Sequence, residues 1–136
     1  MKIKGSCLCG AVQYEVTGPL HNVGHCYCSM CRKSHGAAFA TYAGIDAEKF
    51  QWITGEDMVT DYISSADGGR CFCQKCGSTI GAIENGKVTY ITLGTVDGDP
   101  GVRPQGHIFV GSIAPWVEIT DSLPQFEEYP PGMGPE

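Results

Sequence analysis

Three tight groups of cysteines give this chain its clearest chemical character. They contain all eight cysteines of the sequence: Cys7 and Cys9; Cys26, Cys28 and Cys31; and Cys71, Cys73 and Cys76. A thiolate is a charged, soft ligand, and cysteines two or three residues apart can converge on one soft cation such as Zn²⁺. The spacing therefore predicts metal binding.

The rest of the sequence favours metal binding over disulfide formation. Residues 1–7 lack the apolar stretch of a secretory signal, and no apolar run approaches the length of a membrane span. We therefore expect a reducing, cytoplasmic setting, in which clustered cysteines more often bind metal than pair with one another. Two cysteines separated by a single residue would also close a strained ring.

Four of the cysteines have the spacing of a closed metal site. Residues two apart in a strand point to one face about 6.6 Å apart, so Cys7 and Cys9 can share a metal with Zn–S bonds of about 2.3 Å. Cys73-Gln-Lys-Cys76-Gly77 has the form of a zinc-knuckle turn, in which the glycine relaxes the backbone. Joined, the two pairs predict a sealed four-sulfur site that stabilises the fold and has no position for a substrate.

The central group of three cysteines leaves a fourth ligand position undecided. Cys71 could complete it, which would give two structural sites, or could be a bystander, which would leave the second metal open. Three protein ligands and one free position are typical of catalytic zinc. The histidines that could also complete the site are His25, His35 and His107. Spacing alone leaves these alternatives open.

An open site with three thiolates suits a thiol substrate. Three thiolates give bound Zn²⁺ a net negative charge, which makes it a weak Lewis acid for activating water. Such a metal is better suited to bind a thiol, lower its pKa and present it as a nucleophile. Arg32 and Lys33 directly follow Cys31 and are our candidates for contacts that offset charge beside the thiol.

The elements that hold these cysteines are predicted to be short strands. Nineteen glycines and eight prolines among 136 residues favour many turns. The strongest pattern is Asn85-Gly86 between the runs 78–84 and 87–93, the signature of a tight hairpin. Further strands are expected at 11–17, 23–25, 37–42, 50–53, 58–63, 106–110 and 116–119, with helical turns at 28–33 and 46–49. We expect an all-β protein with one domain over residues 1–129 and a flexible tail over 130–136.

The net charge and the composition limit the classes of binding partner that we expect. The formal net charge is −6, so no overall field attracts nucleic acid, and we expect neither a nucleic-acid nor a membrane partner. With 42% hydrophobic and 18% charged residues, the chain has the composition of a globular protein. The expected partners are small molecules.

Five motifs occur together in one order along the chain. They are Gly5-Ser-Cys-Leu-Cys-Gly10-Ala-Val, His25-Cys-Tyr-Cys-Ser-Met-Cys-Arg-Lys33, Gly36-Ala-Ala-Phe39, Phe72-Cys-Gln-Lys-Cys-Gly77 and Ala114-Pro-Trp116. This joint pattern resembles that of the glutathione-dependent formaldehyde-activating enzymes, whose domain is shared by centromere protein V. The resemblance runs from residue 5 to about residue 126, nearly the whole chain.

The resemblance implies a β-tent zinc fold of small packed antiparallel sheets with short helical turns, and two Zn²⁺ per chain. The ligands that it implies are Cys7, Cys9, Cys73 and Cys76 for a structural zinc, and Cys26, Cys28 and Cys31 for a catalytic zinc. It gives Cys71 no role. The implied reaction joins the thiol glutathione to the aldehyde formaldehyde as S-hydroxymethylglutathione, or cleaves that adduct, which is carbon–sulfur lyase chemistry.

Two departures and two alternatives accompany this resemblance. Ile113 stands where the family often has a lysine before Ala-Pro-Trp, which removes a candidate contact to a carboxylate. Cys71 adds a thiol beside the zinc knuckle. The alternative function is a non-catalytic zinc module that binds a protein partner. Four protein ligands at the second site, or a second site without metal, would favour it. Iron is the alternative metal for a four-sulfur site.

Overall fold

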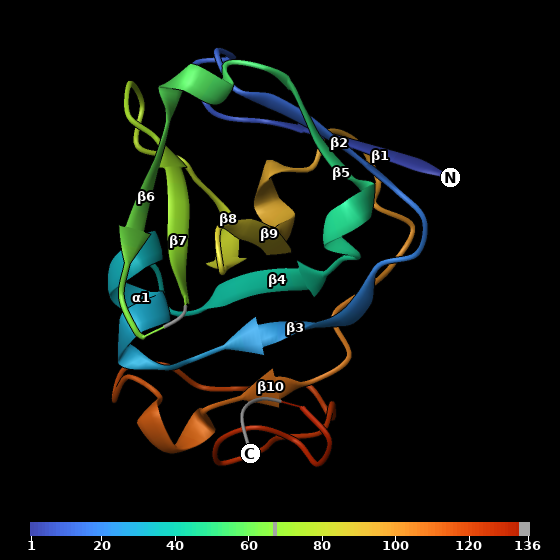
Figure 1. Ribbon diagram of the computed structural model, residues 1–136. Coiled ribbons are helices and arrows are strands. Elements are labelled where there is room, and N and C mark those ends of the chain that lie inside the picture. The colour runs from blue at the N-terminus through green and yellow to red at the C-terminus, as the bar shows by residue number, and fades with distance from the viewer. Residues whose placement is uncertain (67, 134–136) are drawn as a thin grey trace.

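The computed structural model of the chain describes residues 1–66 and 68–133, which form short strands and helical turns (Figure 1). The strands are β1 Lys2–Ser6, β2 Gln13–Thr17, β3 His21–Cys26, β4 Ala40–Gly44, β5 Phe50–Thr54, β6 Val59–Ile63, β7 Gly68–Cys73, β8 Thr79–Glu84, β9 Lys87–Thr92 and β10 His107–Ile108. The helical elements are the α-helix α1 Ser29–His35 and the 3₁₀ turns η1 Ala47–Lys49, η2 Glu56–Met58, η3 Leu93–Thr95 and η4 Val110–Ser112. The all-β prediction is confirmed.

The strands form two sheets. The smaller sheet has the order β1-β2-β5, and the larger has the order β10-β3-β4-β9-β8-β7-β6. Neighbouring strands are antiparallel throughout, as expected, except that the short strand β10 pairs parallel with β3. That pairing places His107 opposite His25 and Ile108 opposite Cys26, which brings the C-terminal part of the chain to the central cysteine group.

The core lies between the two sheets, and alternate residues of the segment predicted as a strand at 11–17 face it. Val12, Tyr14 and Val16 are all buried, and they belong to one apolar cluster with Ile80 of β8 and Ile91 of β9. Burial of this alternating face removes apolar surface from water and fixes the register of β2 against β1 and β5. Among the described residues, no helix is long and apolar enough to cross a membrane.

Local signals explain most of the predicted boundaries. Asn85 and Gly86 adopt φ values of 51° and 78° in the turn between β8 and β9, as a two-residue hairpin requires. Asp46 caps η1 by accepting a hydrogen bond from Glu48 N at 3.0 Å. The strand expected at 106–110 stops after Ile108 because Phe109 turns to a left-handed φ of 57°.

The strand predicted at 116–119 is wrong. This segment is a turn followed by irregular backbone, in which Val117 N donates to Ala114 O at 3.0 Å. Trp116 is 73% exposed, so it lacks the neighbouring strand that would have covered a paired residue. Of the predicted tail, residues 134–136 lie outside the described residues, and Met133 N donates to Pro130 O at 3.1 Å. The domain and tail boundaries stay predictions.

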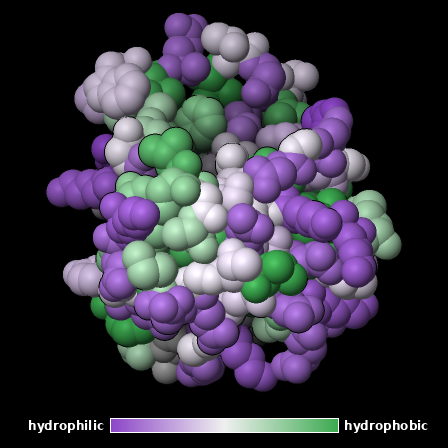
Figure 2. All heavy atoms as spheres, turned by 90° about the horizontal axis from the view of Figure 1, so that it is seen from above, coloured by the Kyte–Doolittle hydropathy of each residue, from purple (hydrophilic) through white to green (hydrophobic). Residues whose placement is uncertain are grey.

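Cys7 and Cys9 lie with Cys73 and Cys76 at one end of β7, and the central cysteine group lies at the other end. In Figure 1 the blue loop between β1 and β2 and the yellow-green turn between β7 and β8 meet at the top, whereas α1 lies at the lower left. Seen from above, the upper end shows hydrophobic groups bordered by hydrophilic residues (Figure 2). The fold therefore places the central cysteine group apart from the other two groups.

Candidate metal centres

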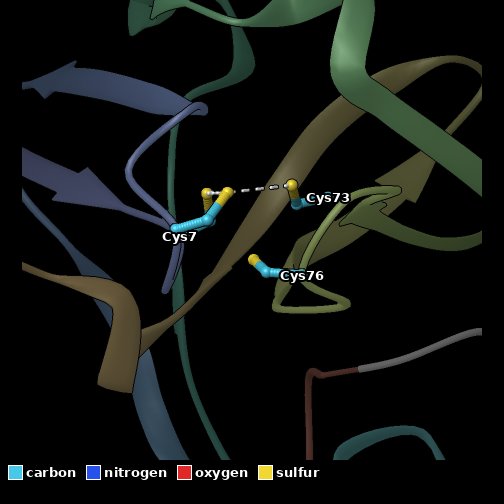
Figure 3. A group of neighbouring side chains, drawn as sticks. Cys7, Cys73 and Cys76 are labelled. Carbon is cyan, nitrogen blue, oxygen red and sulfur yellow. Dashed lines mark hydrogen bonds between the residues drawn. The ribbon is translucent and has the colours of Figure 1, made fainter.

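The first cluster brings two pairs of cysteines together from distant parts of the chain. One ligand atom from each of Cys7, Cys9, Cys73 and Cys76 lies within 4.8 Å of the others. The Sγ atoms of Cys7 and Cys9 are 3.6 Å apart, and those of Cys9 and Cys73 are 3.8 Å apart. In Figure 3 the labelled side chain of Cys7, from the loop after β1, faces those of Cys73, at the end of β7, and Cys76, in the turn that follows. Because tetrahedral Zn–S bonds of about 2.3 Å require sulfurs nearly 4 Å apart, this donor set fits Zn²⁺.

Hydrogen bonds from surrounding residues hold the sulfurs of the four-cysteine cluster in place. Val12 N donates to Cys7 Sγ at 3.3 Å, and Ser78 Oγ lies 3.3 Å from Cys76 Sγ while accepting from Leu8 N at 2.9 Å. The bond with Ser78 is the main reason that the pKa of Cys76 falls to about 5. Ser78 thus connects both cysteine pairs, and the four sulfurs would fill all four positions of a tetrahedral metal.

The second cluster comes from one short segment. Cys26 ends β3, Cys28 is the N-cap of α1, and Cys31 lies in its first turn, so their ligand atoms fall within 4.8 Å of one another. Cys31 N donates to Cys28 Sγ at 3.3 Å. Hydrogen bonds from the neighbouring thiols, that of Cys26 foremost, lower the pKa of Cys28, so this sulfur ionises first. Three soft donors in this arrangement fit the same kind of metal as the first cluster.

No fourth ligand atom joins the second cluster among residues 1–66 and 68–133. Cys71 belongs to neither cluster: it is fully buried, its Sγ faces Gly81 O at 3.7 Å, and burial raises its pKa to about 12. His25 Nδ1 is 2.8 Å from Thr41 Oγ1. The described cysteines therefore divide into four, three and one, and the alternative with Cys71 as a fourth ligand is not what the structure shows.

His107, a candidate ligand in the sequence, instead joins a buried hydrogen-bond chain. Its Nδ1 lies 2.8 Å from the hydroxyl of Tyr27, and its Nε2 lies 2.9 Å from Asp121 Oδ1. Because a carboxylate only accepts, Nε2 donates to Asp121, and Nδ1 lies within hydrogen-bond distance of the Tyr27 hydroxyl. Tyr27 stands between Cys26 and Cys28, so these hydrogen bonds anchor the segment of the three-cysteine cluster to the C-terminal part of the protein.

The predicted charge contacts, Arg32 and Lys33, lie on α1. Arg32 Nε donates to Tyr27 O at 3.2 Å and its Nη2 donates to Ser112 O at 3.3 Å, so this guanidinium ties α1 to backbone carbonyls. Lys33 is exposed. Whether either residue contacts a substrate stays a prediction.

Sequence reasoning missed Arg70, which meets the second cluster directly. Its Nη2 donates to Cys31 Sγ at 3.5 Å. The alternation of β7 offered a signal: Gly69, Cys71 and Cys73 are buried on one face, so Arg70 must point to the other. That face meets α1, where Thr79 of β8 also donates to the carbonyl of Ser34. Arg70 is far from Cys31 in sequence, and Thr79 is far from Ser34, so no rule of sequence spacing could have predicted these contacts.

Comparison with known proteins gives the chain a family. The glutathione-dependent formaldehyde-activating enzyme family matches residues 2–112. A Halomonas elongata protein that carries this enzyme's name is 30% identical over 129 residues, which cover 88% of this chain and 82% of that protein. An uncharacterized lyase of Schizosaccharomyces pombe is 28% identical over 88 residues, covering 64% of this chain and 62% of its own length.

A solved structure shares the fold. The crystal structure of a Rhodobacter sphaeroides protein from structural genomics superposes with a TM-score of 0.56 and 24% identity, covering 90% of this chain and 98% of that one. At this identity the likeness concerns the fold alone. The sequence match over residues 2–112 and the relative that is 30% identical carry the assignment: the chain belongs to the glutathione-dependent formaldehyde-activating enzyme family.

Proposed function

We propose that the protein is a zinc-dependent carbon–sulfur lyase that forms or cleaves the adduct of a small thiol, glutathione, with a small aldehyde, formaldehyde. The observation that carries this proposal is the unequal pair of clusters, one with four sulfurs and one with three. Family membership supports the substrates, since the family is named for glutathione and formaldehyde. The name of the yeast relative supports lyase chemistry. We place the activity in the cytoplasm, where cysteine thiols stay reduced.

The two clusters divide the work in this proposal. Cys7, Cys9, Cys73 and Cys76 would hold a structural zinc, while Cys26, Cys28 and Cys31 would hold a catalytic zinc. A bound zinc with three protein ligands supplies an open position that lowers the pKa of an incoming thiol. The thiol sulfur then bonds to the aldehyde carbon, the carbonyl electron pair moves to oxygen, and that oxygen takes up a proton to balance the one that the thiol released.

In this proposal, the residues around the second cluster hold it in place, and nearby tyrosine side chains keep their protons. Arg70 contacts Cys31, and Tyr27 is held by His107. Burial, and after it the negative charge of Cys26, raises the pKa of both Tyr42 and Tyr129. Both phenols therefore stay neutral at physiological pH and keep a proton that they can donate.

The alternative function, a non-catalytic module that binds a protein partner, would be favoured by four protein ligands at the second site or by a second site that takes up no metal. The described residues bring three sulfurs there and no fourth ligand atom. This geometry favours the enzyme. Cys71, which would have closed the site, is instead buried beside Gly81.

Exchange spectroscopy with ¹³C-formaldehyde and glutathione tests the proposed reaction. We expect the zinc-loaded protein to accelerate exchange between free formaldehyde and the S-hydroxymethyl adduct above the rate without protein. Cys28→Ala should abolish the acceleration, whereas the matched variant Cys71→Ala should retain it, because Cys71 lies outside both clusters. An exchange rate equal to that without protein would contradict the function.

A further inference from the structure

Arg70 brings a fixed positive charge to the three-cysteine cluster. One terminal nitrogen of its guanidinium, Nη2, donates to Cys31 Sγ at 3.5 Å, and the other, Nη1, donates to Ser64 Oγ at 3.0 Å. Arg70 is half-buried, and no ion pair joins it to a carboxylate among residues 1–66 and 68–133. Its anionic neighbour in the described part of the chain is the cysteine cluster.

The position of Arg70 is set by the sheet. β7 lies between β6 and β8, and Arg70 pairs with Tyr62 on one side and with Ala82 on the other. Its neighbours Gly69 and Cys71 are buried on the opposite face, so the arginine side chain is directed toward α1. The contact with Ser64 then orients the guanidinium. Groups that orient and polarise metal ligands in this way affect metal and ligand affinity although they do not touch the metal.

The two clusters differ in this respect. Among the described residues, the groups hydrogen-bonded to sulfur at the four-cysteine cluster are neutral backbone N–H groups, such as that of Val12, and the hydroxyl of Ser78. At the three-cysteine cluster a guanidinium contacts sulfur, and its charge cannot be lost because arginine stays protonated in proteins. A permanent cation is thus placed at the cluster that has a free position.

We propose that Arg70 makes the three-cysteine site selective for an anionic fourth ligand. Three thiolates give a divalent metal a net negative charge, which repels a further anion. The positive charge of one guanidinium in contact with the cluster offsets the net negative charge of the metal and its three thiolates. An anionic ligand then meets a site whose charge is already balanced. That this ligand is a thiolate rests on the proposed function, whereas the preference for an anion rests on Arg70 itself.

Ligand titration of the full-length, cobalt-substituted protein tests this inference through the visible spectrum of the metal. The probes are azide as a small anion, imidazole as a neutral ligand, and glutathione. The variants are Arg70→Gln, Arg70→Lys and a control, Arg103→Gln, which removes an exposed arginine paired with Asp99. We expect Arg70→Gln to weaken azide and glutathione binding by about 10-fold or more and to leave imidazole binding within about 2-fold. Arg70→Lys should retain most of the anion binding, and the control should match the wild type.

Different results separate this inference from the proposed function. Equal azide affinity in the wild type and in Arg70→Gln would overturn the role of Arg70. An equal loss of azide and imidazole binding would overturn it as well, because damage to the site would then explain both. Azide binding that depends on Arg70, together with no glutathione binding by the wild type, would support the role of Arg70 and contradict the proposed function.

Discussion

The two cysteine clusters use the same side chain to build sites of different character. In the four-cysteine cluster, the loop after β1 meets the turn after β7, so that Cys9 and Cys73, 64 residues apart, bring their sulfurs to 3.8 Å. In the three-cysteine cluster, every sulfur comes from residues 26–31. The comparison teaches that a long-range cluster can hold a fold together, whereas a local cluster depends on the fold around it.

The difference has a thermodynamic reason. The two cysteine pairs of the four-cysteine cluster are far apart in sequence and converge only in the folded chain, so a metal bound there would be coupled to folding. Cysteines within six residues can also bind metal in the unfolded chain, which reduces the stabilisation. We therefore expect the metal in the first cluster to stabilise the protein far more than the metal in the second.

Loss of one ligand from the four-cysteine cluster should have the largest effect. Structural zinc in small peptides contributes about 10–16 kcal/mol of apparent binding free energy, so we expect Cys73→Ser to cost several kcal/mol and to abolish cooperative unfolding. Circular dichroism during heating would measure this. If Cys73→Ser unfolded as cooperatively as the wild type and at the same temperature, the four-cysteine cluster would not be the one that stabilises the fold.

Removal of the histidine that anchors the other cluster should have the next largest effect. His107→Ala leaves the buried Tyr27 hydroxyl without its partner, and an unsatisfied buried group costs about 1–3 kcal/mol. Denaturant titration would measure the loss. His21→Ala, at an exposed histidine, is the control and should stay near the wild type. Equal midpoints for both variants would show that the chain from Tyr27 through His107 to Asp121 contributes nothing.

Cys28→Ala should separate function from stability. Native mass spectrometry should show the zinc content falling from two ions to one, while the protein stays folded and loses the exchange activity. Because Cys28 is a half-buried N-cap, we expect a cost of about 1 kcal/mol. Loss of the fold in this variant would mean that the second cluster is structural as well.

Cys71→Ala should have the smallest effect. Its thiol is buried and lies in neither cluster, so we expect two zinc ions, normal activity and a stability loss no greater than the roughly 1 kcal/mol typical of point substitutions. Metal analysis of the purified variant would check the count. Retention of a single zinc ion would show that Cys71 is a ligand after all.

Sequence reasoning predicted the parts of the fold and site that local patterns determine. The hairpin at Asn85-Gly86 and the cap at Asp46 follow from backbone preferences of a few residues, and the cysteine spacing anticipated both clusters. The strand at 116–119 failed because its side-chain pattern required a neighbouring strand that the fold does not supply. A strand pattern alone does not reveal which partner it has.

The contacts that surround the second cluster could not be predicted, because they join distant segments. Arg70 reaches Cys31 across 39 residues, and His107 reaches Tyr27 across 80. Both depend on strand order, since β7 must turn Arg70 toward α1 and β10 must pair parallel with β3. Spacing thus indicated which cysteines could act as ligands and left the fourth position of the second cluster open, while the residues that contact the cluster appear only in the folded structure.

Cadmium-113 NMR of the metal-substituted protein tests directly whether the two clusters differ in having an open position. We expect two resonances. One should be typical of cadmium bound by four sulfurs, and the other typical of cadmium bound by three sulfurs and one oxygen or nitrogen ligand. Added glutathione should leave the first unchanged and shift the second toward the four-sulfur range. Two resonances of the four-sulfur type, unmoved by glutathione, would contradict this expectation.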